Sequence, residues 1–448
     1  MRNSTLFRVF ILLFSFTLTI TACSLPAHAD DNYFPDVSAA DAVFLFNLNT
    51  NKIIFSKNID KQIFTGSLTK MVSGIIFCEY FADRIDDTVE ITEQMLNNAQ
   101  GAKIKLSAGD IVSYKDLLYG VICGGGNDAC YALATALSGS VDAFVKLMND
   151  TVASWGAKNT FFTNPSGYDD EKMHTTAEDA LIISRIAASN SLYMEASSSL
   201  SYIIKLQSSD KEIKLFNRNS LISSFYASGY QNKHAYGLIA GFTDLGQYTA
   251  ITYLEKNGTE FLCAVMGAKE DPYSDEILSY KYVNEISEYA FDNYKYQKDF
   301  DSDQYICELD VSLALPPVNA DKATVDCATV DCYSGGEIYA LVSPDIDVNN
   351  DITYGYYLHD KSLSAPIKPG TVVGGVDIFY NGEIIGSAKL LTGSDVEENS
   401  ILFSLDRMKS FFLDRFFVSS MIIFALLLTA YFVTEHFNIK ITRNKRKK

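Results

Sequence analysis

The spacing of apolar residues in the first half of the chain predicts a β-hairpin followed by helices. Ala42–Leu48 and Ile53–Ser56 are largely apolar runs on either side of the polar turn Asn49–Lys52, a pattern typical of a hairpin. From Ser67 onward, apolar residues recur three and four positions apart, which predicts a helix with one buried face. Helical patterns of this kind continue to about Ala188.

Strand patterns return after this helical stretch. Tyr248–Glu255 and Glu260–Met266 surround Asn257-Gly258, a dipeptide strongly preferred in tight hairpin turns. The segment Ser274–Tyr294 is again helical in pattern. Because strands stand at both ends of this region and helices between them, we expect an α+β domain over residues 30–298 whose terminal segments share one sheet.

The pattern changes from about Asp299. Short alternating stretches separated by turn residues predict a small all-β domain over residues 299–402. Its clearest hairpin joins Val372–Tyr380 to Glu383–Leu391 around Asn381-Gly382. Residues 403–415 are expected to link this domain to an apolar segment.

Residues 1–29 have the features of a secretory signal peptide. A positively charged start is followed by an apolar stretch, and Ala27-His28-Ala29 is a small-x-small cleavage site. The stretch Ile20–Cys23 also resembles a bacterial lipobox, in which Cys23 would carry a lipid. We favour cleavage after Ala29, because a second membrane anchor makes a lipid redundant.

That second anchor is predicted over residues 416–437. Its core from Phe416 to Val433 carries no charge and would be about 27 Å long as a helix, close to the thickness of a bilayer core. Residues 438–448 form a basic tail, and positive flanks of this kind stay on the cytoplasmic side. We therefore expect a single-pass protein of the cell membrane whose body lies on the extracytoplasmic side.

Composition narrows the possible chemistry. The formal net charge is −18 although the tail is basic, so the body is strongly acidic and no nucleic-acid partner is expected. The five histidines and eight cysteines show no metal-site spacing. Neither a metal nor an organic cofactor is predicted.

The cysteines fall into two groups. One group sits among apolar residues and is expected to consist of small core side chains, namely Cys78, Cys123, Cys130 and Cys263. Cys307, Cys327 and Cys332 leave room for one disulfide outside the cell, and their spacing does not decide which two would form it.

A serine and a lysine stand three positions apart at the start of the first predicted helix. Ser67 and Lys70 would project from the same helix face, with the helix N-terminus stabilising negative charge near the serine. A desolvated lysine loses its proton more readily and can accept the proton of the serine hydroxyl. This S-x-x-K pattern alone is common and more often marks a capped helix with a solvated lysine. The rest of the sequence must therefore decide its meaning.

A series of short motifs accompanies this pair. They are Thr65-Gly-Ser-Leu-Thr-Lys-Met71, Asp116-Leu-Leu-Tyr-Gly120, Gly126-Asn-Asp-Ala129, Asn164-Pro-Ser-Gly-Tyr-Asp-Asp170, His174-Thr-Thr-Ala177, Asn217-Arg-Asn-Ser-Leu221, Ser364-Ala-Pro-Ile-Lys-Pro-Gly370 and Val373-Gly-Gly-Val376. In this order they resemble the low-molecular-weight penicillin-binding proteins that are D-alanyl-D-alanine carboxypeptidases. The resemblance extends from about Ala42 to Leu391, which makes it specific.

The resemblance implies acyl transfer on peptidoglycan stem peptides, with β-lactams as further ligands. A serine attacks the D-Ala-D-Ala bond, the terminal D-alanine leaves, and water hydrolyses the acyl-enzyme. Ser67 matches this nucleophile, Lys70 the general base, and Asn127 the asparagine of the S-x-N motif, which hydrogen-bonds the lysine and the substrate amide. The backbone amides of Ser67 and Phe242 match the oxyanion hole. The implied fold is an antiparallel sheet flanked by helices, with the β domain as a pedestal.

Two motifs depart from the family pattern. The S-x-N motif reads Gly125-Gly126-Asn127, so the serine hydroxyl of its proton relay is missing. The K-T-G motif reads Ile239-Ala240-Gly241, so apolar side chains replace the cation and the hydroxyl that engage the terminal carboxylate of the substrate. Gly241, which permits close backbone approach, remains.

No neighbouring residue on the strand replaces this cation. Lys233 would lie roughly 20 Å from Ile239 in an extended strand, and His234 is out of register with it. Because loss of one transition-state donor costs about 10²–10³ in rate, we expect impaired turnover or none.

Three functions fit these observations. The first is an impaired serine carboxypeptidase, favoured by the intact Ser67, Lys70 and Asn127. The second is a catalytically silent relative that binds cell-wall peptides or a membrane partner, favoured by the lost polar groups. The third, a β-lactamase on the same fold, is disfavoured because an added glutamate loop is not found and the C-terminal β domain argues against it.

Overall fold

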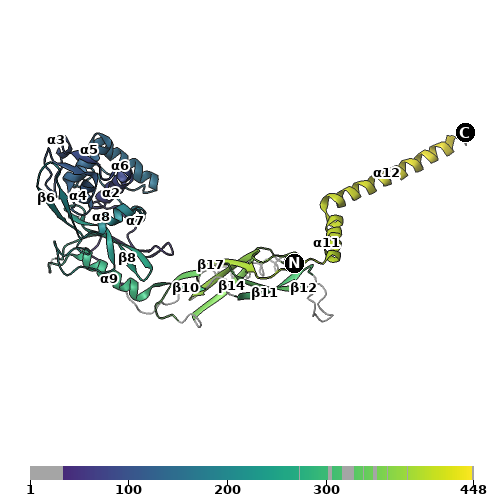
Figure 1. Cartoon of the computed structure of the whole chain (residues 1–448). Helices are drawn as coiled ribbons and strands as arrows, with labels where there is room; N and C mark the ends of the chain where they lie inside the picture. The colour runs from purple at the N-terminus through teal and green to yellow at the C-terminus, as the bar shows by residue number, and fades with distance from the viewer. Residues whose placement is uncertain are drawn as a thin grey trace, which may run out of the picture. The chain divides into compact units, whose positions relative to one another are not determined.

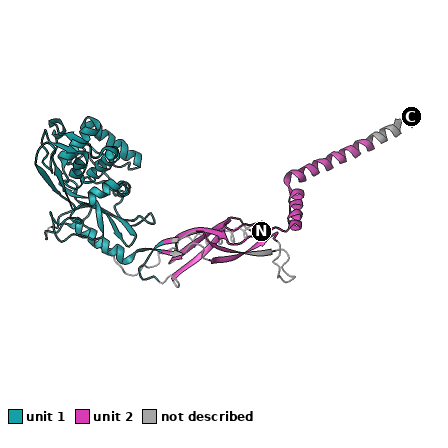
Figure 2. Ribbon diagram, viewed as in Figure 1, with its two compact units in different colours: residues 1–297, 340–346 teal, residues 298–339, 347–448 magenta. Residues whose placement is uncertain are grey.

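The computed structural model describes residues 34–271, 273–300, 305–314, 327–335, 338–346, 351–360, 362–380 and 382–445. The predicted signal peptide, the alternative lipidation at Cys23 and the last three residues of the basic tail lie outside these ranges. The chain forms two compact units, residues 1–297 with 340–346 and residues 298–339 with 347–448 (Figure 2).

The first unit is built on a five-stranded antiparallel sheet of order β2-β1-β9-β8-β7 (Figure 1). Its strands are β1 (Ala42–Asn47), β2 (Lys52–Lys57), β7 (Ala235–Thr243), β8 (Gln247–Lys256) and β9 (Thr259–Ala268). The predicted hairpins β1–β2 and β8–β9 both form, and β1 pairs with β9, which confirms that the two ends of the region share one sheet. Asn257 and Gly258 turn with φ of 53° and 81°, the left-handed conformation that this dipeptide tolerates.

The sheet separates two buried clusters of side chains. Alternate residues of β1 point to opposite faces: Phe44 and Phe46 join the helices that follow β2, whereas Val43 and Leu45 join α9 (Leu278–Asn293). Figure 1 shows α9 running beside β8, away from the other helices. This layered arrangement is the predicted α+β fold.

The helices on the first face occupy most of residues 68–198. They are α2 (Leu68–Phe81), α3 (Glu93–Leu96), α4 (Tyr114–Ile122), α5 (Asn127–Ser138), α6 (Val141–Trp155), α7 (Ala177–Ser189) and α8 (Ser191–Ser198), with a 3₁₀ turn at Ala82–Arg84. Two small sheets accompany them, β3 (Thr88–Glu90) with β4 (Ile111–Ser113) and β5 (Ser201–Lys205) with β6 (Glu212–Phe216). The helical region therefore runs ten residues further than predicted. It is also interrupted by strands too short to show a detectable alternation.

Helix α2 runs through the middle of this face. The apolar residues whose spacing predicted it are all fully buried, namely Leu68, Met71, Val72, Ile75 and Ile76. Its polar residues Thr69 and Ser73 are buried as well, so the helix is covered on nearly every side rather than on the single face predicted. Gly74 makes this possible, because a side chain there would come within 2.9 Å of Ile122 and Tyr193.

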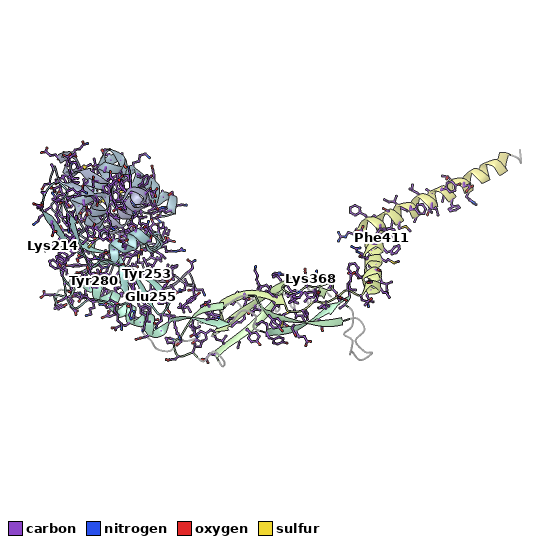
Figure 3. The ribbon with its side chains drawn as sticks, in the orientation of Figure 1. Lys214, Tyr253, Glu255, Tyr280, Lys368 and Phe411 are labelled. Atoms are coloured by element: carbon purple, nitrogen blue, oxygen red, sulfur yellow. The ribbon has the colours of Figure 1, made fainter. Side chains whose placement is uncertain are left out.

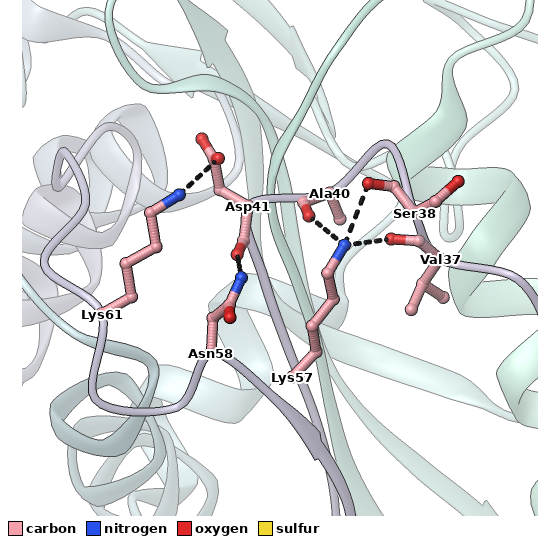
Figure 4. Close-up of polar contacts among 7 residues, drawn as sticks. All are labelled: Val37, Ser38, Ala40, Asp41, Lys57, Asn58 and Lys61. Carbon is pink, nitrogen blue, oxygen red and sulfur yellow. Dashed lines mark hydrogen bonds and ion pairs between the residues drawn. The ribbon is translucent and has the colours of Figure 1, made fainter.

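The segment that precedes β1 is held to the sheet by a lysine. Lys57 Nζ donates to the carbonyl oxygens of Val37 (2.9 Å), Ser38 (2.9 Å) and Ala40 (2.7 Å), as Figure 4 shows. Nearby, Lys61 forms an ion pair of 2.9 Å with Asp41 (Figure 4). Charge-assisted hydrogen bonds therefore hold the segment before β1 against the neighbouring strand.

The second unit contains a six-stranded sheet of order β14-β16-β17-β12-β11-β15. Its strands are β11 (Tyr305–Ser312), β12 (Cys327–Ser334), β14 (Ile352–Leu358), β15 (Leu363–Ser364), β16 (Val372–Tyr380) and β17 (Glu383–Thr392), and β10 (Lys295–Phe300) pairs separately with β13 (Ile338–Val342). The predicted hairpin is β16–β17. An all-β domain followed by a helix is thus confirmed.

Two helices end the described chain. The predicted linker forms helix α11 (Ser400–Leu413), because Asn399 Oδ1 accepts hydrogen bonds from the backbone of Ile401 (3.1 Å) and Leu402 (3.3 Å). Helix α12 (Arg415–Lys445) contains the stretch Arg415–His436, with mean hydropathy 2.3. By length and composition this stretch is able to cross a membrane. Phe411, labelled in Figure 3, lies in α11 with its ring 5.0 Å from that of Phe417.

Candidate active site

One pocket of the first unit collects the residues predicted to form the site. It has a volume of about 400 Å³, and its lining includes Ser67, Lys70, Gly125, Asn127, Ile239, Ala240, Gly241 and Phe242. Lys233 and His234 do not belong to its lining, as their distance along the strand predicted. The fold therefore brings together segments that lie far apart in sequence.

Ser67 stands directly before the first turn of α2. Its side chain makes no capping hydrogen bond to the helix, so the hydroxyl is not used to start the helix. Gly241 on β7 lies against it, since a Cβ at position 241 would overlap Ser67 Oγ. The next residue, Phe242, also lines the pocket. The backbone of β7 thus reaches the serine closely enough for an amide to face a group bound there.

Lys70 lies half-buried one turn further along α2. Its Nζ donates to the carbonyl oxygen of Ser166 at 2.6 Å. The pKa of Lys70 is lowered from 10.5 to about 8, mainly because burial disfavours its charge, with Cys130 opposing this effect and the positive charge of Arg218 adding to it. A lysine with this pKa is partly neutral near neutral pH and is able to accept a proton.

The turn that receives Lys70 is organised by Asn164. Its side-chain oxygen accepts hydrogen bonds from the backbone of Ser166 (3.1 Å), Gly167 (2.9 Å) and Tyr168 (3.2 Å). Gly167 passes so close to Gly66 that a Cβ would overlap its carbonyl oxygen. The motif Asn164–Asp170 therefore serves to place a carbonyl oxygen against the lysine.

Asn127 begins helix α5, and its amide is oriented by the loop before it. The side-chain nitrogen donates to the carbonyl oxygen of Gln100, and the backbone N–H donates to Ala102 at 2.7 Å. Because the carbonyl oxygen of Gln100 can only accept a hydrogen bond, the amide nitrogen of Asn127 must face it. The side-chain oxygen of Asn127, Oδ1, therefore points the other way. It is buried with no hydrogen-bond partner among the described residues. The pocket therefore contains an unsatisfied acceptor, and Lys70 is bonded to Ser166 rather than to Asn127.

The adjacent aspartate fixes the same loop. Asp128 is buried, and its carboxylate accepts hydrogen bonds from the backbone of Ile104 (3.0 Å), Lys105 (2.9 Å) and Leu106 (3.1 Å). These bonds hold the loop on the first turn of α5, where negative charge is stabilised by the helix. The sequence motif contained this aspartate but gave no reason for it.

The degenerate motifs leave the pocket short of polar groups. Ile239 and Ala240 are only 5% and 7% exposed, and they join the buried clusters on opposite faces of the sheet. Gly125 has a φ of 67° and lies against Arg218, since a Cβ there would be 3.0 Å from Arg218 Cγ. An arginine stem therefore borders the position of the missing serine.

Arg218 is the functional candidate that sequence reasoning missed. It lines the pocket, its Nε donates to the carbonyl oxygen of Gly124 at 3.3 Å, and its Cζ lies 4.5 Å from the centroid of the Tyr226 ring. The only available signal was its position inside the motif Asn217–Leu221, because no strand or helix spacing connects it with Ser67. Among the described residues, no group of three or more His, Cys, Asp or Glu side chains is placed to hold a metal ion.

Family models match both units. The model for D-alanyl-D-alanine carboxypeptidase matches residues 28–270, and that for the penicillin-binding protein 5 C-terminal domain matches residues 320–398. The chain belongs to the D-alanyl-D-alanine carboxypeptidase family. Members of this family are hydrolases that act on peptidoglycan, and the family includes penicillin-binding proteins.

Relatives match over most of their length. D-alanyl-D-alanine carboxypeptidase DacA of Haemophilus influenzae is 28% identical over 396 residues, covering 83% of this chain and 90% of the relative. DacF of Bacillus subtilis is 23% identical over 371 residues, covering 82% and 88%. The structure of penicillin-binding protein 5 from Haemophilus influenzae has a TM-score of 0.59 and 27% identity, covering 81% and 99%. These relatives confirm the predicted transpeptidase-like fold with its C-terminal β domain.

Proposed function

We propose that this chain is a membrane-anchored serine D-Ala-D-Ala carboxypeptidase that forms an acyl-enzyme at Ser67 and turns over slowly. The observation that carries the proposal is a half-buried Lys70, with its pKa lowered to about 8, in the same pocket as Ser67. A lysine that served only to hold structure would gain nothing from losing its proton. A general base requires that loss near neutral pH.

Each retained group has a role in this reaction. Lys70 takes the proton of Ser67 Oγ as that oxygen attacks the carbonyl carbon of the D-Ala-D-Ala bond. The backbone amides of Ser67 and Phe242 stabilise the oxyanion. Asn127 Oδ1, which has no partner among the described residues, accepts an N–H group of the stem peptide. The terminal D-alanine leaves, and water releases the peptide from Ser67.

Turnover is slow in this proposal because three polar groups of the family motifs are absent, the relay hydroxyl and the two groups that engage the substrate carboxylate. Gly125 supplies no hydroxyl, and Ile239 and Ala240 are apolar. Each such loss costs about 10²–10³ in rate when it removes a transition-state donor, although losses at one site need not add. The same observation favours the alternative, a silent relative that binds cell-wall peptides or a membrane partner.

The proposed location follows from the two ends of the chain. Helix α12 serves as a single membrane anchor, and the basic residues after it stay in the cytoplasm. Both compact units would then lie on the extracytoplasmic side, where peptidoglycan is found. A signal peptide over residues 1–29 would deliver them there.

Labelling with a fluorescent penicillin tests the proposal. The full chain in detergent is incubated with the probe, with Ser67→Ala as the control, and released D-alanine is measured from a D-Ala-D-Ala peptide. We expect a covalent adduct that the control lacks, together with weak D-alanine release. A folded protein that forms no adduct at high concentration and long times would exclude the enzyme and support the silent relative.

A further inference from the structure

Three aromatic rings extend the pocket outward from its edge. Phe216, the last residue of β6, and Phe225, in the loop that follows, have ring centroids 3.7 Å apart and planes only 2° from parallel. Figure 3 labels Lys214 on the same strand. Tyr226 meets Phe225 edge to face at 5.0 Å and itself lines the pocket. Phe216, Phe225 and Tyr226 are called the aromatic platform below.

The platform faces solvent rather than the core. Phe225 is 57% exposed although Phe216 covers one of its faces, and Tyr226 is 48% exposed. A single exposed aromatic ring is common in folded proteins, whereas contiguous exposed rings that continue a pocket are typical of a binding surface. The platform therefore requires a ligand rather than a packing explanation.

The loop between β6 and β7 is held in place by its own polar groups. The side-chain nitrogen of Gln231 donates to the carbonyl oxygens of Ser220 (2.9 Å) and Ala227 (3.1 Å), which ties distant parts of the loop together. The side-chain oxygen of Gln231 accepts a hydrogen bond from the backbone of Gly229 at 3.1 Å. The rings are thus presented in fixed positions, which lowers the entropy cost of binding a ligand on them.

The chemistry of this loop indicates an uncharged ligand. Residues 219–232 contain no charged side chain, although 21% of the residues in the chain are charged. Beside the rings the loop offers the hydroxyl groups of Ser224, Tyr226 and Ser228, and all three residues are exposed. Antibody loops use the same combination, because rings supply contact area and hydroxyls supply adaptable hydrogen bonds. A neutral ligand with both an apolar face and polar substituents fits this surface.

We propose that the aromatic platform binds a neutral aminosugar ring of the glycan strand, so that the pocket prefers stem peptides that are still attached to their sugar. A pyranose ring has a face of C–H groups that packs on an aromatic ring, and its hydroxyl and amide groups point outward toward hydroxyls such as that of Ser224. This inference rests on the proposed function, because the peptide attached to that sugar is the proposed substrate of Ser67.

One ligand is long enough to occupy both places. Ser67 and Tyr226 line the same pocket, and the Phe225 ring lies one step of 5.0 Å beyond Tyr226. An extended peptide of four residues spans roughly 13 Å, more than twice that step. A stem peptide held at Ser67 therefore reaches out of the pocket past Tyr226 with its sugar still attached.

The test compares a D-Ala-D-Ala stem peptide with the same peptide carrying its disaccharide. Both are titrated by calorimetry into the full chain in detergent with Ser67→Ala, which keeps the peptides intact. The ratio of the two affinities is then compared among this protein and versions that also carry Phe225→Leu, Phe225→Trp or Tyr80→Ala. Tyr80→Ala is the matched control, because Tyr80 is 54% exposed but does not line the pocket. Circular dichroism confirms that each variant is folded.

We expect the peptide with the disaccharide to bind more tightly, and Phe225→Leu to reduce this preference roughly two- to tenfold, the size of one ring contact. Phe225→Trp should retain the preference because it keeps an aromatic face, and Tyr80→Ala should leave it unchanged. Equal affinity for the two peptides when Phe225 is present overturns the proposal. A preference that Phe225→Leu leaves intact overturns it as well.

Two further arms separate this proposal from its alternatives. A cross-linked peptide dimer without sugar is titrated in the same way, and if it gains the same affinity and loses it with Phe225→Leu, the platform binds peptide and the glycan proposal is wrong. Penicillin labelling of the native chain tests acyl transfer independently. If no adduct forms, the proposed enzyme fails, yet a preference for the disaccharide that depends on Phe225 still supports glycan binding.

Discussion

Gly241 illustrates how little space surrounds the candidate nucleophile. Position 241 needs no positive φ, so its glycine is explained by contact: any Cβ would overlap Ser67 Oγ. This is the one residue of the third motif that the chain retains, whereas the two residues before it became apolar. Retention of the contact without the polar groups is consistent with a serine that is still used.

Replacing this glycine should remove acylation without unfolding the protein. For Gly241→Ala we expect adduct formation with fluorescent penicillin to fall at least a hundredfold, because either Ser67 or β7 must shift, and a displaced nucleophile loses its alignment. The midpoint temperature of thermal unfolding should change by only a few degrees. Gly355→Ala in β14 is the matched control, since its Cβ would meet only the Phe379 ring at 3.3 Å. Normal labelling of Gly241→Ala would contradict the close approach.

The depressed pKa of Lys70 sets a direction for pH dependence. Burial disfavours the protonated form, so the neutral base becomes populated as the pH rises through about 8. We expect the acylation rate to increase across this range and to level off above it. In Arg218→Gln the midpoint should move upward, because a positive neighbour that lowers the pKa has been removed. An acylation rate that stays constant between pH 6 and pH 9, measured by quenching the reaction at set times, would exclude Lys70 as the base.

At the scale of elements, the register of strands β11 and β12 bears on which two of the three outer cysteines could form a disulfide. In the β11–β12 pair Cys307 stands opposite Cys332, whereas Cys327 stands opposite Ser312 at the other end. Partners in an antiparallel pair have Cα atoms about 4.5–5.5 Å apart, which lies within the range of disulfides. Sequence spacing left three pairings possible, and pairing of the strands favours one.

We therefore predict that Cys307 and Cys332 form a disulfide under oxidising conditions. Oxidised glutathione would accept the two electrons and two protons of the thiols and become two molecules of reduced glutathione. Closing this loop should contribute about 3 kcal/mol to the free energy of unfolding of the β domain, measured by melting with and without reductant. Cys327→Ser should keep the bridge and Cys332→Ser should lose it, as peptide mapping would show. A bridge that involves Cys327 would contradict the register.

For the molecule as a whole, we expect membrane attachment to depend on the last two helices. Helix α11 presents Ile401, Leu405 and Met408 on one face, with exposed fractions of 73%, 57% and 56%, and α12 follows after a single residue. An exposed apolar face next to a candidate span is suited to the membrane surface. We therefore expect α11 to lie in the membrane interface and α12 to cross the bilayer.

Deleting residues 415–448 should abolish resistance to carbonate extraction, because only a spanning helix withstands it. Some binding to vesicles should persist through α11, and deleting residues 400–448 should remove that as well. Protease added to intact cells without a wall should degrade both compact units in the native chain. Protection of those units would place the body in the cytoplasm and contradict the proposed orientation.

The sequence by itself determined the parts of this protein that rest on local pattern. Both hairpins marked by Asn-Gly, the helix beginning at Ser67 and the apolar C-terminal span were predictable, because turn geometry, helical spacing and hydropathy are encoded within a few residues. Ser67, Lys70 and Asn127 could be proposed as site residues from short motifs for the same reason, and the fold places all three in one pocket. Strands of three residues, such as β3, were not, since they are too short to alternate detectably.

Tertiary structure decided which distant residues share the pocket. Arg218 lies against Gly125. Lys70 donates a hydrogen bond to the carbonyl oxygen of Ser166, and the Asn127 side chain donates one to the carbonyl oxygen of Gln100. None of these contacts follows from spacing along the chain, because each joins loops whose separation is set by packing of α2, α5 and β7. The burial that lowers the pKa of Lys70 also exists only in the folded chain. The motifs could therefore suggest a candidate nucleophile and base, but only the fold could show which residues surround them.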